Sequence, residues 1–170
     1  TGLSDAARRF RSAMREDAPL ERVRLDRLLE TLLETLTEAN PTVTIHRDLV
    51  PATVRSNGGL QLAVEEILTN AIKHTDRDPE ITITLHIEGD EVVLHVADNG
   101  PGIPATERNA LEGTAETPTD HGSGLGLWLV RWALTDVDGE VAYAHNDPRG
   151  AVITLRLPSA AETDSASADP

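Results

Sequence analysis

The strongest constraint on the fold is an apolar–polar alternation that reverses at a glycine turn. Residues 81–98 read ITITLHIEGDEVVLHVAD, two alternating runs that meet at Glu88-Gly89-Asp90, where glycine can take a positive φ. Residues 141–157, VAYAHNDPRGAVITLRL, repeat the pattern around a turn at Asn146–Gly150. Such alternation is typical of strands that bury one face and expose the other. The sequence therefore predicts two β-hairpins.

Segments with helical spacing alternate with shorter strand-like runs. Helices are expected over residues 4–17, the leucine stripe 25–36, residues 59–75, residues 106–113 and a segment from 122–126 to about 135. Asp26 is the expected N-cap of the leucine helix, and Ser56 or Asn57 that of the next. Further strands are expected near 23–25, 42–46 and 51–55, and an irregular loop at 113–121. This order predicts an α+β sandwich with helices on one face of a mixed sheet.

Composition excludes several classes of function. The net charge of -14 repels polyanions, so nucleic acid is a poor candidate partner. No apolar run approaches the roughly 18–20 residues that span a bilayer, so no membrane contact is expected of this segment. The absence of cysteine excludes disulfides and thiolate chemistry and fits a reducing, cytoplasmic setting.

The helix expected over residues 59–75 carries polar side chains along one face. Glu66, Asn70 and either Lys73 or His74 follow one another at three or four residues, which aligns them on a helix. An amide oxygen can ligate Mg²⁺, an ammonium can neutralise phosphate, and a carboxylate can orient or deprotonate a nucleophile. The stripe suits a magnesium-bound triphosphate, and the alternative for such a stripe alone is a solvated helix face.

Two glycine-containing segments follow that helix. Asp98-Asn99-Gly100-Pro101-Gly102-Ile103-Pro104 begins where a strand ends, and on its own it also suits a simple turn. Gly122-Ser123-Gly124-Leu125-Gly126-Leu127 precedes a helix, whose N-terminus and backbone N–H groups favour phosphate. The second segment lacks the Gly-Lys-Ser/Thr ending of a Walker A loop.

In this order and spacing, the three segments resemble the catalytic ATP-binding domain of sensor histidine kinases, in the superfamily that includes DNA gyrase B and the ninety-kilodalton heat-shock chaperones. Residues 66–75 resemble the N box of that family, 98–103 its first glycine box and 122–127 its second. The resemblance spans about residues 20–158. It implies that about three helices pack on one face of a mixed five-stranded sheet, preceded by a short helix.

The resemblance also implies roles for individual residues. Asn70 would hold the Mg²⁺ on the ATP phosphates, Lys73 would face those phosphates, and Glu66 completes the expected catalytic set. Asp98 would accept a hydrogen bond from the adenine amino group, and Thr154 would share a water molecule with Asp98 and the base. The other expected nucleotide contacts are His74, Gly100, Gly102, Ile103, Gly122, Ser123, Gly124, Leu125, Gly126 and Leu127.

A histidine kinase also needs a phosphoacceptor histidine, and none of the six histidines precedes His46. Residues 1–18 are therefore expected to be the C-terminal end of the dimerisation and phosphoacceptor hairpin, cut downstream of its histidine. Residues 19–158 are the expected ATP-binding catalytic domain, and 159–170 an acidic disordered tail. On this interpretation the segment does not phosphorylate itself.

The resemblance implies a set of ligands and partners. They are ATP and ADP with Mg²⁺, the dimerisation domain of the same homodimeric protein, and the receiver domain of a response regulator. Two alternatives stay open. The first alternative is a gyrase-like or chaperone-like ATPase, because the ATP hydrolases of the superfamily use a glutamate at the position of Glu66 to activate water. A module that holds nucleotide without phosphoryl transfer is the other.

Acidic residues outnumber basic ones by 29 to 15, and Lys73 is the only lysine. This composition is typical of proteins from salt-accumulating halophiles such as halophilic archaea, and an ordinary acidic protein from a GC-rich genome is the alternative. At 1 M salt a Debye length of about 3 Å screens the repulsion between surface carboxylates. We expect a higher melting temperature in molar salt than in dilute buffer. Equal melting temperatures would contradict salt adaptation.

Overall fold

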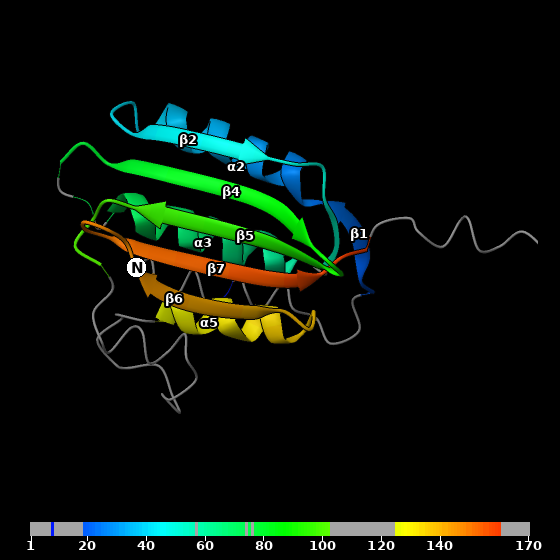
Figure 1. Cartoon of the computed structure of the whole chain (residues 1–170). Coiled ribbons are helices and arrows are strands. Elements are labelled where there is room, and N and C mark those ends of the chain that lie inside the picture. Colours follow the sequence, from blue (N-terminus) through cyan, green and yellow to red (C-terminus); the bar gives the residue numbers. More distant parts are fainter. Residues whose placement is uncertain are drawn as a thin grey trace, which may run out of the picture.

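The computed structural model describes residues 8, 19–56, 58–73, 75, 77–102 and 125–160, the side chains of 125–129 excepted. Figure 1 shows the arrangement of its helices and strands. In chain order they are β1 (Glu21–Arg24), α2 (Leu25–Ala39), β2 (Thr44–Leu49), β3 (Thr53–Ser56), α3 (Gly59–Lys73), β4 (Glu80–Glu88), β5 (Glu91–Asp98), α5 (Leu125–Thr135), β6 (Glu140–His145) and β7 (Ala151–Pro158).

The main sheet has five strands in the order β2-β4-β5-β7-β6. β2 runs parallel to β4, and the other neighbours are antiparallel, so the sheet is mixed as expected. β1 and β3 form a separate antiparallel ribbon at one end. The helices α2, α3 and α5 lie on one face of the sheet (Figure 1), which confirms the α+β sandwich.

Both predicted hairpins are present. β4 and β5 pair from Glu88↔Glu91 to Ile81↔Asp98, and Gly89 in their turn has a φ of 59°. β6 and β7 pair on either side of the turn at residues 146–150. Side chains alternate between the two faces, and those of one face are buried against the helices.

The core lies between the helices and the inner face of the sheet. The leucine helix α2 buries Leu25, Leu29 and Leu33 at 0–1% exposure. Burying one such side chain contributes roughly 1.5–3 kcal/mol. α3 and α5 pack against each other, α3 over the strands β4 and β5 and α5 beside the edge strand β6. Among the described residues, no helix is long and apolar enough to cross a membrane.

The start of α2 differs from the prediction. The helix begins at Leu25, and its N-cap, Arg24, makes no side-chain capping bond. Leu25 is buried and donates its N–H to the Ala52 carbonyl oxygen at 2.9 Å. Asp26 therefore falls within the first turn, where its carboxylate accepts two bonds of 2.9 Å from the Arg24 guanidinium. The expectation that Asp26 is the N-cap was wrong, because burial of Leu25 starts the helix earlier.

The boundaries of α3 are close to the prediction, but the expected cap is not formed by Ser56. The Ser56 hydroxyl oxygen accepts the Gly58 N–H at 3.1 Å, a turn that precedes the helix. The helix ends at Lys73 rather than Thr75. Several predicted features lie outside the described residues. They are Asn57, the expected helices at 4–17 (Arg8 apart) and 106–113, the loop at 113–121 and the tail from 161.

Two histidines stack on the outer, helix-free face of the sheet. The rings of His86 and His95 lie 5.3 Å apart between centroids. His86 Nε2 lies 2.8 Å from a Glu88 oxygen, and His95 Nδ1 lies 2.9 Å from the Thr154 hydroxyl. The pKa of His95 is lowered, chiefly by burial of the ring and to a smaller extent by the nearby His86. The fold therefore favours the neutral His95 ring.

This lowered pKa predicts a pH dependence of stability. An unfolded histidine titrates near pH 6.5, so just below that pH the unfolded chain binds a proton that folded His95 resists. We expect the free energy of unfolding to fall as the pH drops below about 6.5. Denaturant titrations at several pH values give the slope of the free energy of unfolding against pH. This slope should be smaller for His95→Gln than for the wild type, and unchanged for His145→Gln, which alters an exposed histidine. An unchanged slope in His95→Gln would contradict the assignment.

Candidate functional site

The expected site residues of α3 and β5 lie at one end of the sheet. The C-terminal ends of α3 and β5, the first residues of β7 and the start of α5 meet there, at the left in Figure 1. α3 packs against β5 and α5 in the folded domain. The fold thus brings together four segments that are separated in the sequence.

The polar stripe of α3 lies beside its buried face. Ala63, Ile67 and Ala71 pack into the core, whereas Glu66 and Asn70 are half-buried and Lys73 is exposed. Within the described part of the chain, no residue hydrogen-bonds to the Asn70 amide or forms an ion pair with Lys73. These two polar groups are therefore available to a ligand at the end of the helix.

Asp98, the last residue of β5, is held in a defined orientation. Its Oδ1 accepts the N–H of Gly100 at 2.9 Å and that of Ala151 at 3.2 Å. No described residue donates to Oδ2. One carboxylate oxygen is therefore anchored by the backbone, and the other can accept a hydrogen bond from a ligand.

Asn99, the next residue, connects this loop to the segment that follows α3. Its Oδ1 accepts the Glu80 N–H at 2.9 Å, and its Nδ2 donates to the Asp78 carbonyl oxygen at 3.2 Å. Asp78 has a φ of 45°. The Asn99 amide therefore serves the backbone on both sides of the loop.

The turn between β6 and β7 packs against the same loop, which the sequence analysis did not anticipate. Gly150 has a φ of 121°, and a Cβ atom there would lie 1.9 Å from the Asp98 carbonyl oxygen. Gly102 has a φ of 89° and faces the Tyr143 hydroxyl and the Gly150 carbonyl. Both positions require glycine. The glycine of the 146–150 turn was the only sequence signal, and it does not reveal what the turn contacts.

Thr154 does not lie with Asp98. Inner residues of β7 alternate with outer ones, and Thr154 lies opposite His95 on the outer face, where its hydroxyl bonds to that histidine. Asp98 is two residues beyond Val96, whose side chain is buried against the helices. The residue of β7 that meets the Asp98 carboxylate is Ala151, through its N–H. The expectation of a water shared by Thr154 and Asp98 was therefore wrong.

The second glycine segment is described only in its last part. Leu125, Gly126 and Leu127 form the first turn of α5, so the helix begins where the sequence indicated. Gly122, Ser123 and Gly124 lie outside the described residues, as do His74 and Ile103. Their expected nucleotide contacts stay predictions.

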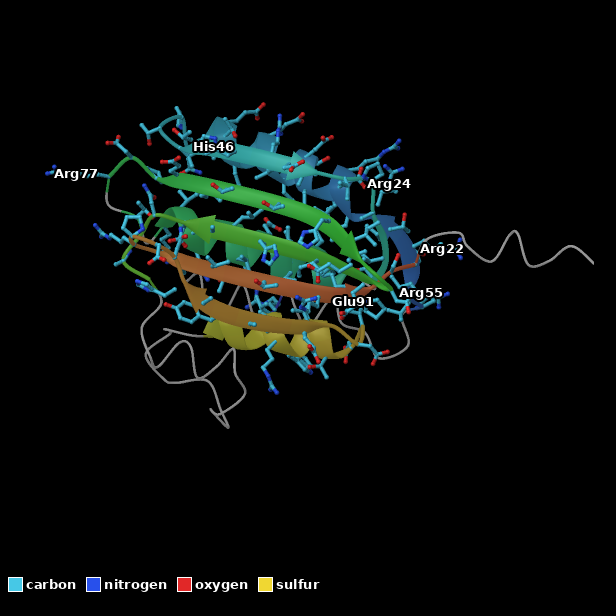
Figure 2. All side chains as sticks on the ribbon, viewed as in Figure 1. Arg22, Arg24, His46, Arg55, Arg77 and Glu91 are labelled. Atoms are coloured by element: carbon cyan, nitrogen blue, oxygen red, sulfur yellow. The ribbon has the colours of Figure 1, made fainter. Side chains whose placement is uncertain are left out.

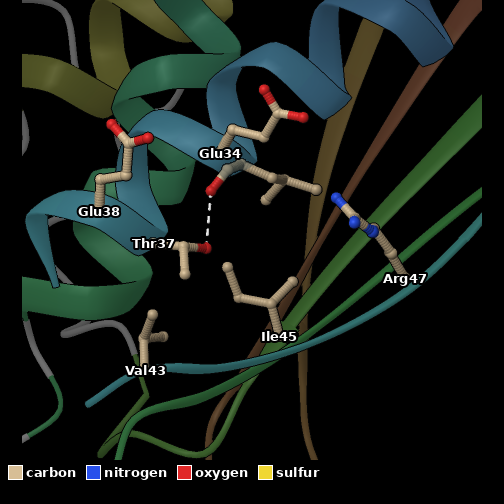
Figure 3. A pocket seen from close by; sticks show the side chains of 7 residues that line it. Glu34, Thr37, Glu38, Val43, Ile45 and Arg47 are labelled. Atoms are coloured by element: carbon tan, nitrogen blue, oxygen red, sulfur yellow. Dashed lines mark hydrogen bonds between the residues drawn. The ribbon is translucent and has the colours of Figure 1, made fainter. Parts of the chain in front are cut away.

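A separate pocket of about 430 Å³ opens at the β2 edge of the sheet, between α2 and β2. Figure 3 shows Ile45 on β2, and Val43 just before that strand, on the side of Thr37 of α2; Glu34 and Glu38 of α2 also line the pocket. The Thr37 hydroxyl donates to the Leu33 carbonyl oxygen at 2.8 Å. None of the expected site residues lines this pocket.

Charge is unevenly placed on this acidic domain. Figure 2 shows Arg22, Arg24 and Arg55 together at the β1–β3 ribbon, the end of the molecule away from Asp98. Arg24 is engaged by Asp26 and holds the pKa of that carboxyl below its usual value. Lys73, in contrast, stands at the site end of α3. Among the described residues, no three histidine or carboxylate side chains gather as a metal site.

Comparisons with known proteins show the family of the chain. The model of the histidine kinase-, DNA gyrase B- and HSP90-like ATPase family matches residues 55–161, more than half of the chain. The sensor protein KdpD of Escherichia coli K12 is 38% identical over 98 residues, which cover 54% of this chain and 11% of KdpD. The sensor histidine kinase CitA of Klebsiella pneumoniae is 31% identical over 118 residues, 65% of this chain and 21% of CitA.

The fold has equally similar relatives. The structure of the mycobacterial sensor histidine kinase MprB matches with a TM-score of 0.71 and 27% identity, over 83% of this chain and 98% of that one. The chain thus spans a small part of the curated relatives but nearly the whole of this solved chain. It belongs to the family of histidine kinase-, DNA gyrase B- and HSP90-like ATPases, as an ATP-binding domain of the sensor histidine kinase type.

Proposed function

We propose that this domain binds Mg-ATP at the end of the sheet where α3 and β5 meet, and transfers the γ-phosphoryl group to a histidine of the dimerisation domain of its own protein. The phosphoryl group then passes to the receiver domain of a response regulator. The observation that carries the proposal is the carboxylate of Asp98, with Oδ1 bonded to two backbone N–H groups and Oδ2 bonded to none of the described residues.

Asp98 is suited to recognise adenine. A carboxylate only accepts hydrogen bonds, and the adenine amino group is a donor. Anchoring Oδ1 on backbone N–H groups prevents the side chain from turning away, so Oδ2 is presented in one orientation. Gly100 and Gly102, which follow in the chain, let the backbone pass close to the base.

The stripe on α3 is suited to the phosphates. Asn70 presents a half-buried amide with no partner among the described residues. Its carbonyl oxygen would be one protein ligand to a Mg²⁺ ion bound with the phosphates. When bound, the metal neutralises charge that develops on the phosphates. Lys73 adds a cation, and the start of α5, with residues 122–127, adds backbone N–H groups.

The transfer itself needs few covalent steps by the protein. A neutral imidazole nitrogen of the acceptor histidine attacks the γ-phosphorus in line, the bond from phosphorus to the bridging oxygen breaks, and ADP leaves with that electron pair. The phosphorylated ring then loses the one N–H proton that it carries, on its other ring nitrogen, to the surroundings. In this proposal Glu66 orients the acceptor or takes that proton, the roles that a carboxylate performs in phosphoryl transfer. Catalysis is thus mainly positioning and charge neutralisation.

The proposal includes the arrangement of the parent protein. Residues 19–158 form the catalytic domain, and residues 1–18 lead from a dimerisation hairpin that bears the acceptor histidine. The described histidines support this, because His86 and His95 are occupied on the outer face of the sheet. The acidic, lysine-poor composition further supports origin in a salt-accumulating organism.

Asp98→Asn tests adenine recognition. The substitution keeps the size of the side chain, but an N–H₂ group at the Oδ2 position would face the donor of the base. We expect affinity for Mg-ATP to fall at least about tenfold, or roughly 1.4 kcal/mol, in calorimetric titrations in molar salt. Asp138→Asn, an identical change in the turn after α5, should bind as the wild type does. Undiminished ATP affinity in Asp98→Asn would remove Asp98 from the site.

Glu66→Gln tests the role of the carboxylate in transfer. With a separately supplied histidine hairpin and labelled ATP, we expect transfer to slow about 100-fold, the usual contribution of a general base, while ATP affinity is retained. Glu65→Gln, one residue earlier on α3, is the matched control. A wild-type transfer rate in Glu66→Gln would exclude the base. Rapid ATP hydrolysis by the wild type that Glu66→Gln abolishes would favour the ATPase alternative.

A further inference from the structure

The turn between β6 and β7 makes two side-chain hydrogen bonds to the loop that begins at Asp98. Asn146 Nδ2 donates to the Asp98 carbonyl oxygen at 2.7 Å. Arg149 Nε donates to the Gly100 carbonyl oxygen at 3.0 Å. The turn is closed on itself by a bond of 3.0 Å from the Asn146 N–H to the Gly150 carbonyl. The turn therefore acts as one unit on the backbone of the loop.

The hydrogen bond from Asn146 replaces a backbone bond that the sheet does not provide at Asp98. The ladder between β5 and β7 stops at Ala97↔Val152, one residue short of Asp98. The Asp98 carbonyl oxygen would then lack a backbone donor on that side, and a partly buried carbonyl left unpaired is costly. The amide of Asn146 supplies this missing bond, and it holds the peptide unit from which the Asp98 side chain projects.

Gly150 also restrains Asp98, because its backbone packs directly against that residue. The position of a Cβ atom at Gly150 would lie 1.9 Å from the Asp98 carbonyl oxygen, so the two backbones are in direct contact. The next residue, Ala151, donates its N–H to Asp98 Oδ1. Asp98 is thus held at its carbonyl and at its carboxylate by residues of one short segment.

Arg149 acts on the following part of the loop. Its bond to the Gly100 carbonyl restrains a buried glycine whose own N–H is bonded to Asp98 Oδ1. Displacement of Gly100 would therefore move one of the two donors that orient the carboxylate. The Arg149 side chain comes from an exposed residue, so its removal leaves the core intact.

We propose that Asn146 and Arg149 are positioning residues for the Asp98 carboxylate and that they determine the preference of the site for adenine over guanine nucleotides. This inference rests on the proposed function. Adenine carries an amino donor at the position where guanine carries a carbonyl acceptor. A carboxylate oxygen fixed at that position accepts from the first and repels the second, whereas a mobile carboxylate discriminates less.

The test compares Asn146→Asp and Arg149→Met with matched controls. Asn146→Asp keeps the shape but removes the N–H donor. Asn40→Asp removes an equivalent part-buried donor, to the Leu36 carbonyl at the end of α2. Arg55→Met, on the ribbon at the far end, controls for Arg149→Met. Calorimetric titrations of Mg-ATP and Mg-GTP into the whole chain, well below each variant's melting temperature, give the two affinities.

For both test variants we expect ATP affinity to fall about tenfold, with GTP affinity unchanged or higher, so that the ATP-to-GTP ratio falls by at least the same factor. The controls should keep the wild-type ratio. Because loss of stability alone does not change a ratio of affinities, this readout separates positioning from structural support. Arg149→Met provides the test should Asn146→Asp fail to fold.

Three other results would overturn the inference. An unchanged ATP affinity and ratio in both variants would show that the turn does not position Asp98. Equal losses for ATP and GTP would show that it supports the loop without setting specificity. An absence of saturable ATP binding by the folded wild type would refute the proposed function, and the inference with it. This outcome is seen in the wild type alone, so it differs from the two results above, which are seen only in the variants.

Discussion

The pairing of β5 between β4 and β7 is the constraint on which the rest of the structure depends. The strand is central in the sheet, and its register puts Leu94 and Val96 against the helices and His95 on the outer face. Asp98 continues the inner series at the end of the strand. A slip of one residue would exchange the two faces. Apolar burial along β5 therefore decides on which side of the sheet the carboxylate of Asp98 emerges.

The helices add a second constraint at the same end of the domain. α3 buries one face through Ala63, Ile67 and Ala71, which leaves Glu66 and Asn70 at the boundary between core and solvent. Burial of the apolar face fixes the rotation of the helix, because turning it would expose several buried side chains at roughly 1.5–3 kcal/mol for each large one. Burial of the apolar face thereby holds the polar stripe at the same end of the domain as the end of β5.

Electrostatics and burial have different roles in this domain. The net charge of the chain is -14, whereas its only lysine, Lys73, lies at the end of α3. The outer face carries the stacked pair His86 and His95, and burial lowers the pKa of His95, which favours the neutral form of that ring. On the proposed function, this site supplies nucleotide recognition and charge neutralisation, and the acceptor histidine comes from another part of the protein.

Residue periodicity by itself determined the two hairpins, the leucine helix and α3, because alternation and helical spacing are local properties that burial enforces. The order of the three motifs predicted Asp98 and Asn70 as site residues, and these assignments stay predictions. The cap of α2 was misplaced, since the burial of Leu25 and its bond to Ala52 depend on a distant strand. Thr154 was misassigned, because only the register shows that it faces His95. The contacts of Asn146, Arg149 and Gly150 with the Asp98 loop join segments about 50 residues apart, and only tertiary packing creates them.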